Sequence, residues 1–330
     1  MTVMRGIRIA SWAGLAIIVL ALPSMLSDQW LGVAVQGLLL CFGTLGLTLL
    51  AGYGGQFSIA SAGLMAVGAA GQAVVTLQLG APAIVGLIGA MLFGGAVGLL
   101  IGLPALRVKG LYLMLATLAA HFILLYFWRR YVNDNYGAVG VIYDPLNVLG
   151  FDIATDRDWY YLLVPLIALV MVFVANVKHT GVGRSLFAVK QNEVAAAASG
   201  INVPHLKLAA FTVSAALTGL GGALYAQYYL SLTSEYFTLQ MAINFFVALI
   251  VGGQFFAGGA VVGAMFVVAA PVFLTNLSNS VGNDWLTAHT GEVTNFIFGA
   301  AIIAVLMTQP GGIWGAVDWV QRRLPWRSAT

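Results

Sequence analysis

The side chains that most often do chemistry in proteins are few and scattered in this sequence. The four histidines, His121, His179, His205 and His289, lie in four different segments, and Cys41 is the single cysteine. Metal sites and catalytic sites need such groups at short, regular spacing, so we expect no metal site and no enzyme activity. The sequence also has no Gly-x-x-x-x-Gly-Lys-Ser/Thr phosphate-binding loop, so if the activity of this chain is driven by ATP, the nucleotide must bind another polypeptide.

Recognition of a polar solute in an apolar environment is a different chemistry, and residues 51–63 (AGYGGQFSIASAG) favour it. Gly, Gln and Ser concentrated between apolar runs predict a broken or re-entrant backbone, which is tolerated at membrane depth where protein or a wet cavity surrounds it. The following helix would then present free N–H groups to a carboxylate or carbonyl oxygen. Small-residue helix packing is the alternative. The candidate path residues here are Gly54, Gly55, Gln56, Ser58 and Ser61.

A second glycine-rich stretch repeats part of the first. Residues 252–255 have the same Gly-Gly-Gln-Phe sequence as residues 54–57, which suggests a parallel structural duplication and adds Gln254 to the candidates. Asn244 and His121 are polar groups inside predicted spans and therefore need partners. For each of them, a helix–helix hydrogen bond and a contact with substrate are both open. The run GLGGAL at 219–224 lies inside a span, where it is typical of close helix packing rather than of a dinucleotide loop.

These candidates have to be positioned by helices in a bilayer. The chain has 330 residues, of which 61% are hydrophobic and 8% charged, with a mean hydropathy of +0.95. Soluble domains carry about 25% charged residues, so this composition requires lipid as the solvent. We predict one all-α polytopic transmembrane domain over 1–330 with ten spans, the first a retained helix rather than a cleaved signal peptide. The spans are 9–26, 30–51, 57–79, 82–104, 111–128, 160–177, 207–230, 238–256, 258–277 and 292–308.

The basic residues orient this arrangement. With ten spans and a cytoplasmic N-terminus, eleven of the fourteen Lys and Arg residues fall on the cytoplasmic side, and nine of the eleven acids fall outside. Because Lys and Arg set orientation, we predict that both termini are cytoplasmic. The eleven are Arg5, Arg8, Arg107, Lys109, Lys178, Arg184, Lys190, Lys207, Arg322, Arg323 and Arg327.

Two loops stand out in this topology. The cytoplasmic loop 178–207 carries four basic residues and a single acid, Glu193, and its middle, 185–199, has good helix formers between Gly183 and Gly200. This predicts a short helix outside the membrane, either offered to a partner or simply covering the bundle. The external loop 129–159 contains five Asp residues and is too short for a domain with its own core. It is interpreted as a solvated connector, and the alternatives are a short surface helix or a docking surface for an external partner.

Four segments carry a family resemblance. They are AGYGGQFSIASAGLMAVGA (51–69), LRVKGLYLMLATLA (106–119), GVGRSLFAVKQNEVAAAASGINVPHLKLAAFTVSAALTGLGGALYA (181–226) and MTQPGGIWG (307–315). In order and spacing the chain resembles the permease subunits of branched-chain amino-acid ATP-binding-cassette (ABC) importers, of the LivM type. One departure is Ala120-His121-Phe122 after Thr117-Leu118-Ala119, where the family often has a Glu.

The resemblance implies a function and a set of partners. It implies a permease of the bacterial cytoplasmic (inner) membrane that moves branched-chain amino acids or related small solutes inward. The implied partners are a second homologous permease subunit, two ABC ATPases that bind ATP and Mg, an external substrate-binding protein and the lipid bilayer, with no nucleic acid. The segment that docks on the ATPase would include Arg184, Glu193, Ala195, Ala196 and Gly200. No cofactor is implied for this chain itself.

The alternative is a stand-alone secondary transporter or channel for a small polar or amphipathic solute. Ion-coupled transport predicts ionisable groups inside the spans, and there His121 is the one titratable candidate. The sequence leaves open which solute is carried, since urea and short amides are handled by similar permeases, and whether the permease pair is homodimeric or heterodimeric.

Overall fold

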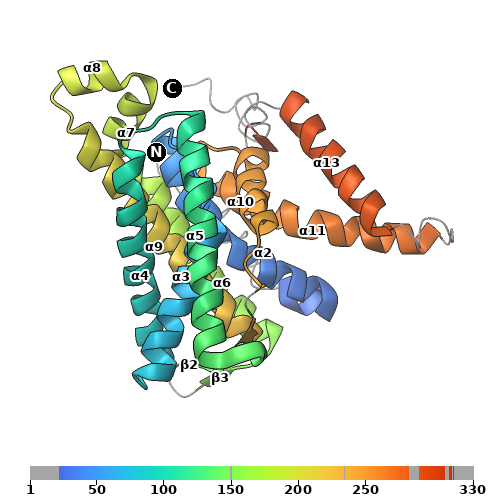
Figure 1. Ribbon diagram of the computed structural model, residues 1–330. Coiled ribbons are helices and arrows are strands. Elements are labelled where there is room, and N and C mark those ends of the chain that lie inside the picture. The colour runs from blue at the N-terminus through green and yellow to red at the C-terminus, as the bar shows by residue number, and fades with distance from the viewer. Residues whose placement is uncertain are drawn as a thin grey trace, which may run out of the picture.

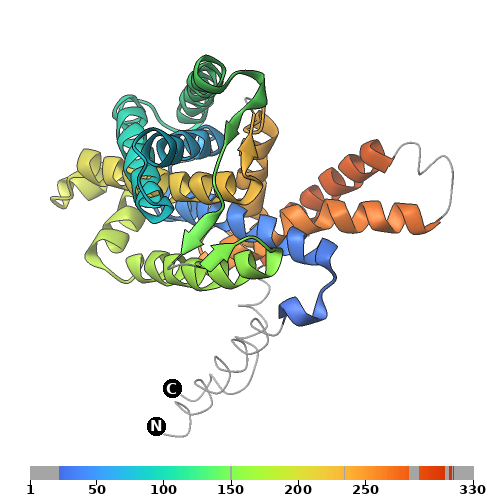
Figure 2. The ribbon, with the colours of Figure 1, turned by 90° about the horizontal axis from the view of Figure 1, so that it is seen from below.

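The computed structural model describes residues 22–148, 151–233, 235–281, 290–308, 312–313 and 315. Most of the predicted first span, 9–26, and nearly all of the basic C-terminal segment 309–330 lie outside the described residues. The described chain is a bundle of helices with a helical hairpin extending from one side (Figures 1 and 2).

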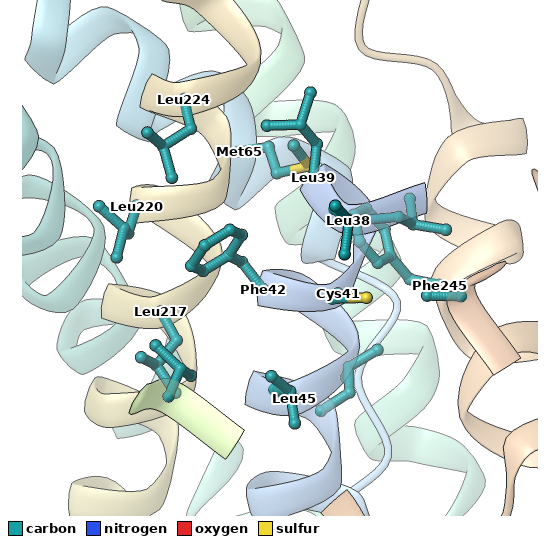
Figure 3. Close-up of a cluster of buried hydrophobic side chains, with 14 of the residues drawn as sticks. Leu38, Leu39, Cys41, Phe42, Leu45, Met65, Leu217, Leu220, Leu224 and Phe245 are labelled. Carbon is teal, nitrogen blue, oxygen red and sulfur yellow. The ribbon is translucent and has the colours of Figure 1, made fainter. Parts of the chain in front are cut away.

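The bundle is built around α2 (Asp28–Leu47), which continues into the π-helical turns of η1 (Thr48–Tyr53). Within its most apolar window 94% of the residues are buried, as expected for a helix that is hydrophobic on every side. It packs against α9 (Val203–Tyr229), α6 (Asp156–Val177) and α11 (Ala257–Val281). Figure 3 shows side chains of α2 meeting Leu217, Leu220 and Leu224 from α9, with Met65 and Phe245 from two further helices.

Small residues bring α9 close to α3 (Ser61–Ala73) and α4 (Ala83–Ala105). A Cβ on Gly68 would lie 2.0 Å from the Gly219 carbonyl oxygen, and one on Gly222 equally close to that of Met65. The run 219–224 therefore packs helices together, as predicted. After α3, the π-helical turns of η2 (Val74–Gln78) lead toward α4.

The segment predicted as an external connector is partly regular. The helix α5 (Leu111–Tyr136) continues eight residues past the predicted end at 128, and η3 (Gly137–Val139) follows it. Then β1 (Val141–Ile142) pairs with β4 (Ser231–Leu232), and β2 (Leu146–Val148) pairs with β3 (Phe151–Ile153). The fold is all-α apart from these short strands, and β2 and β3 lie at one end of the bundle (Figure 1).

The boundary between the predicted spans 238–256 and 258–277 lies between α10 (Leu239–Gly252) and α11. With 14 residues, α10 is shorter than the roughly 20 residues that cross a bilayer. The helix α13 (Thr290–Thr308), in the last predicted span, forms with α11 the hairpin that extends from the bundle (Figures 1 and 2).

Six helices in the described part are long and apolar enough to cross a membrane. They are Asp28–Tyr53, Ala83–Ala105, Leu111–Tyr136, Asp156–Val177, Val203–Tyr229 and Ala257–Ser278. Large apolar side chains such as Leu92, Leu100, Phe122, Phe127 and Leu169 are exposed on α4, α5 and α6, as expected where lipid replaces water. The chain is a multi-pass helical membrane protein, while the ten-span count and its orientation stay predictions.

Candidate functional site

The polar loop 178–207 forms two helices, where one was predicted over 185–199. They are α7 (Gly181–Gln191) and α8 (Glu193–Ala198), and both lie at the end of the bundle opposite β2 and β3 (Figure 1). Asn192 separates them because its backbone is extended, with φ −157° and ψ 108°. Its Oδ1 accepts hydrogen bonds from the N–H groups of Val194 and Ala195, so the break is also a helix N-cap. Helix propensity alone did not reveal this break.

The residues predicted to dock on an ATPase divide between two faces of this pair. Arg184, Ala195 and Gly200 are exposed, whereas Ala196 is buried against the bundle. Gly200 has φ +83°, which ends α8 in a conformation that suits glycine. Next to Ala195, Val194 is 76% exposed. The outer face of the loop therefore carries Arg184, Val194, Ala195 and Gly200.

Glu193 faces the bundle rather than solvent. Its carboxylate pairs with Lys109, 2.5 Å away in the α4–α5 turn, and with Lys207 of α9, which is only 5% exposed. Burial by itself raises the pKa of the Glu193 carboxyl, but hydrogen bonds and charge from Lys109 and Lys207 outweigh it and hold the pKa below its ordinary value. The residue thus fastens α8 to two other elements.

Lys190, near the end of α7, reaches into the bundle. Its Nζ donates hydrogen bonds to the carbonyl oxygens of Gly52 at 2.7 Å and Ala51 at 3.5 Å. The same ammonium lies 4.3 Å from the centre of the Phe255 ring. Burial lowers the pKa of Lys190 below its ordinary value. The loop is therefore in direct contact with both glycine-rich stretches.

The predicted break in the backbone is present. The helix η1 ends at Tyr53, Gly55 has φ +68°, and residues 55–60 are non-helical until α3 begins at Ser61. The segment alternates buried and half-buried residues, with Gln56, Ser58 and Ser61 buried. This is irregular backbone surrounded by protein.

Two N–H groups near the start of α3 are bonded to another helix. Ile59 N–H donates to Thr117 Oγ1 at 3.1 Å, and Gly63 N–H donates to His121 Nδ1 at 3.2 Å, both acceptors being on α5. His121 thus makes the helix–helix hydrogen bond that was one of its two interpretations. Because Nδ1 accepts, the ring proton belongs on Nε2, which is buried without a hydrogen-bond partner among the described residues.

The remaining candidate path residues make different contacts. Asn244 accepts a hydrogen bond from Gln240 on the same helix at 3.2 Å, which is neither of the two contacts considered for it. Gln254 lies in the turn between α10 and α11. Its carbonyl oxygen is so near Gly52 that a Cβ added to Gly52 would lie 1.9 Å from that oxygen. Residues 54–56 thus form a first group beside α7, with Gln254 next to Gly52, and residues 58–63 form a second group beside α5.

One polar hollow links the first group to the loop. Its volume is about 360 Å³, and it is lined by Gln56, Lys109, Lys190, Glu193 and Lys207, among others. Gln56 Nε2 is buried and has no hydrogen-bond partner in the described part of the chain. No three His, Cys, Asp or Glu side chains among the described residues could hold a metal ion together.

Sequence reasoning missed the roles of Lys109, Lys190 and Lys207. All three had been assigned to the cytoplasmic side by their charge alone, and the structure brings them to one hollow. Their partners are 84, 138 and 14 residues away in sequence, respectively, and charge patterning does not specify such pairings.

A bundle of apolar helices with a two-helix polar loop at one end is the architecture of a multi-pass membrane protein. The family described as branched-chain amino acid transport system / permease component matches residues 29–306, and the chain belongs to this family. The predicted resemblance is thereby confirmed. Membership of a permease-component family does not favour the stand-alone transporter or channel.

Individual relatives agree with this assignment. The chain is 25% identical over 323 residues to the high-affinity branched-chain amino acid transport system permease protein LivM of Salmonella typhimurium, covering 91% of this chain and 73% of the relative. The values are the same for LivM of Escherichia coli. It is 24% identical to the probable permease protein LivM of Methanocaldococcus jannaschii, over 70% of this chain and 67% of that protein. No solved structure matches the chain.

Proposed function

We propose that this chain is one transmembrane subunit of an ABC importer in the bacterial cytoplasmic membrane. It would pair with a second homologous permease subunit and receive branched-chain amino acids, or related small solutes, from an external binding protein. Two partner ATPases would bind ATP and Mg. The substrate class comes from the printed names of the relatives, and the absence of a phosphate-binding loop agrees with ATP binding elsewhere.

The observation that carries the proposal is the two-sided construction of the α7–α8 loop. Its inner side is fastened by Lys190 and Glu193. Its outer side leaves Arg184, Val194 and Ala195 exposed. A loop that is tied to the bundle on one side and free on the other transmits a push from an external partner, provided that the partner contacts it differently in two states. Solute would then pass inward as the bundle changes between outward-open and inward-open forms.

The test uses a matched pair of exposed apolar residues at opposite ends of the bundle. Val194 on α8 is 76% exposed, and Leu79, after η2, is 72% exposed. We expect Val194→Asp to prevent co-purification of the ATPases and to abolish uptake of radiolabelled leucine by cells. Leu79→Asp should leave both intact. Retention of the ATPases and of leucine uptake by Val194→Asp would overturn the docking assignment.

Substrate identity needs a separate measurement. The binding protein that is captured with the assembled transporter should be titrated with leucine, isoleucine, valine, urea and a short amide. We expect binding of the branched-chain amino acids. Exclusive binding of urea or of the amide would contradict the substrate class and leave the importer assignment standing. Uptake by the purified chain alone, driven by an ion gradient, would instead contradict the importer assignment.

A further inference from the structure

The two Gly-Gly-Gln-Phe segments, 54–57 and 252–255, lie next to each other at the α7–α8 end. The Gln254 carbonyl oxygen approaches Gly52 so closely that a Cβ at Gly52 would be 1.9 Å away. The preceding helix ends just before the first glycine in one segment and at it in the other, and in each the second glycine has positive φ, +68° at Gly55 and +107° at Gly253. These are two breaks in the helical backbone, brought together by the fold.

One side chain of α7 contacts both breaks. Lys190 Nζ donates to the carbonyl oxygen of Gly52, at the end of η1, and lies over the ring of Phe255 from the second break. Its methylene groups cover Gly55, where a Cβ would be 2.8 Å from Lys190 Cγ. An ammonium at a helix C-terminus also matches the partial negative charge of the terminal carbonyl groups.

The carbonyl oxygen of Gly52 is available for this role. The N–H groups of Gly54, Gly55 and Gln56 bond to the carbonyls of residues 49, 51 and 50 respectively. Gly52 O instead receives Lys190 at 2.7 Å. The contact is half-buried. A charge-assisted hydrogen bond of this kind is stronger than a neutral one, so this position favours a charged donor.

We propose that Lys190 is the positioning residue that carries movement of α7 to the two glycine breaks at 54–57 and 252–255. This deepens the proposed function and rests on it, since α7 moves in response to a partner only if the α7–α8 loop docks on one. A displacement of α7 pulls on the end of η1 through Gly52 and on the α10–α11 turn through Phe255. Glycine at positive φ lets both connections bend there.

The test compares Lys190→Met with Lys178→Met in the assembled transporter, reconstituted into liposomes with its partner subunits. Lys178 is the matched control because it lies in the same loop and also over a phenylalanine ring, Phe256 at 5.7 Å. Solute taken up and ATP hydrolysed are measured together. We expect Lys190→Met to lower uptake per ATP about tenfold, in the usual range of coupling energies, with hydrolysis within about twofold of wild type. Lys178→Met should retain the wild-type ratio.

Lys190→Arg should restore most of the ratio, because guanidinium also donates to carbonyl groups and stacks on aromatic rings. If Lys190→Met does not give a monodisperse complex, Lys190→Gln replaces it and should give an intermediate ratio, since its shorter amide can still donate. The proposal would be overturned if Lys190→Met or Lys190→Gln kept the wild-type uptake per ATP. It would also be overturned if Lys190→Arg lowered uptake per ATP as much as Lys190→Met. Failure of the proposed function gives a different result from failure of this proposal. In that case the ATPases would still co-purify with the Val194→Asp variant.

Discussion

The two Gly-Gly-Gln-Phe segments have the same four residues and different surroundings. In both, the helix ends at or just before the first glycine, and the second glycine takes positive φ. After the first segment, the chain stays non-helical until Ser61, whereas after the second, α11 begins at Ala257. The tetrapeptide therefore decides how each preceding helix stops, and tertiary contacts decide when the next one starts.

The contacts that hold the first segment open come from α5. Thr117 and His121 accept hydrogen bonds from the N–H groups of Ile59 and Gly63, which satisfies backbone donors that would otherwise be orphaned in a buried segment. The second segment is instead closed tightly, since a Cβ on Gly252 would lie 1.9 Å from the Gly259 carbonyl oxygen. The same sequence makes an extended break in one place and a compact turn in the other.

The largest effect should come from filling the close approaches around these helix ends. Gly52→Ala places a methyl group against the carbonyl of Gln254, and Gly252→Ala places one against that of Gly259, each at 1.9 Å. Because backbone rather than a flexible side chain is in the way, we expect each to cost about 3 kcal/mol. Thermal unfolding of the purified chain in detergent measures this. Gly181→Ala, with nothing within 4 Å of its Cβ, is the control and should leave the midpoint unchanged.

A smaller effect should separate the two positive-φ glycines. Gly253 has φ +107° and ψ +105°, outside the left-handed helical region, whereas Gly55 has φ +68°. We expect Gly253→Ala to cost about 2–3 kcal/mol and Gly55→Ala about 1–2 kcal/mol, the latter with a displaced Lys190 side chain. Equal shifts of the unfolding midpoint for the two variants would show that the breaks are equally strained.

Much of this comparison could be predicted from the sequence, and part could not. Gly, Gln and Ser between apolar runs indicated the break after Tyr53 because glycine and polar residues interrupt a helix locally. The helix-forming composition of 185–199 indicated a helix but missed Asn192, whose side chain caps a new helix in place of continuing the old one. The inward positions of Lys190 and Glu193 depend on residues distant in the sequence, and no local pattern encodes them.

The hollow beside the first break is lined in part by Glu193, which holds α8 to the bundle through Lys109 and Lys207. The variant Glu193→Gln tests how much these ion pairs contribute. The variant loses charge-assisted hydrogen bonds to Lys109 and Lys207, so we expect α8 to be held less firmly by about 1–2 kcal/mol. A spin label at the exposed Ala197→Cys reports its mobility, since Cys41, the other thiol, is buried. The label should be more mobile in Glu193→Gln at pH 7.

The mobility of the same spin label should depend on pH in one direction. The folded-state pKa of Glu193 lies below its ordinary value of 4.5, so its stabilising contribution is complete above that pH and is lost as the pH falls through the lower folded value. Wild-type mobility should therefore rise only below about pH 4.5, and Glu193→Gln should show no such rise. A wild-type rise between pH 6 and 7 would contradict this assignment.

The smallest effect should distinguish the two phenylalanines. Phe255 lies 4.3 Å from Lys190 Nζ, while Phe57 makes an edge contact with Phe246 at 5.8 Å between ring centres. Phe255→Leu removes a cation–π contact of about 0.5–1 kcal/mol, and Phe57→Leu removes a ring contact of about 0.5–1.5 kcal/mol. If α7 acts on both breaks through Lys190, only Phe255→Leu should lower solute uptake per ATP, by about two- to fivefold, although Phe57→Leu costs at least as much stability. A decrease that followed stability rather than contact with Lys190 would mean that the two breaks respond to α7 through general packing.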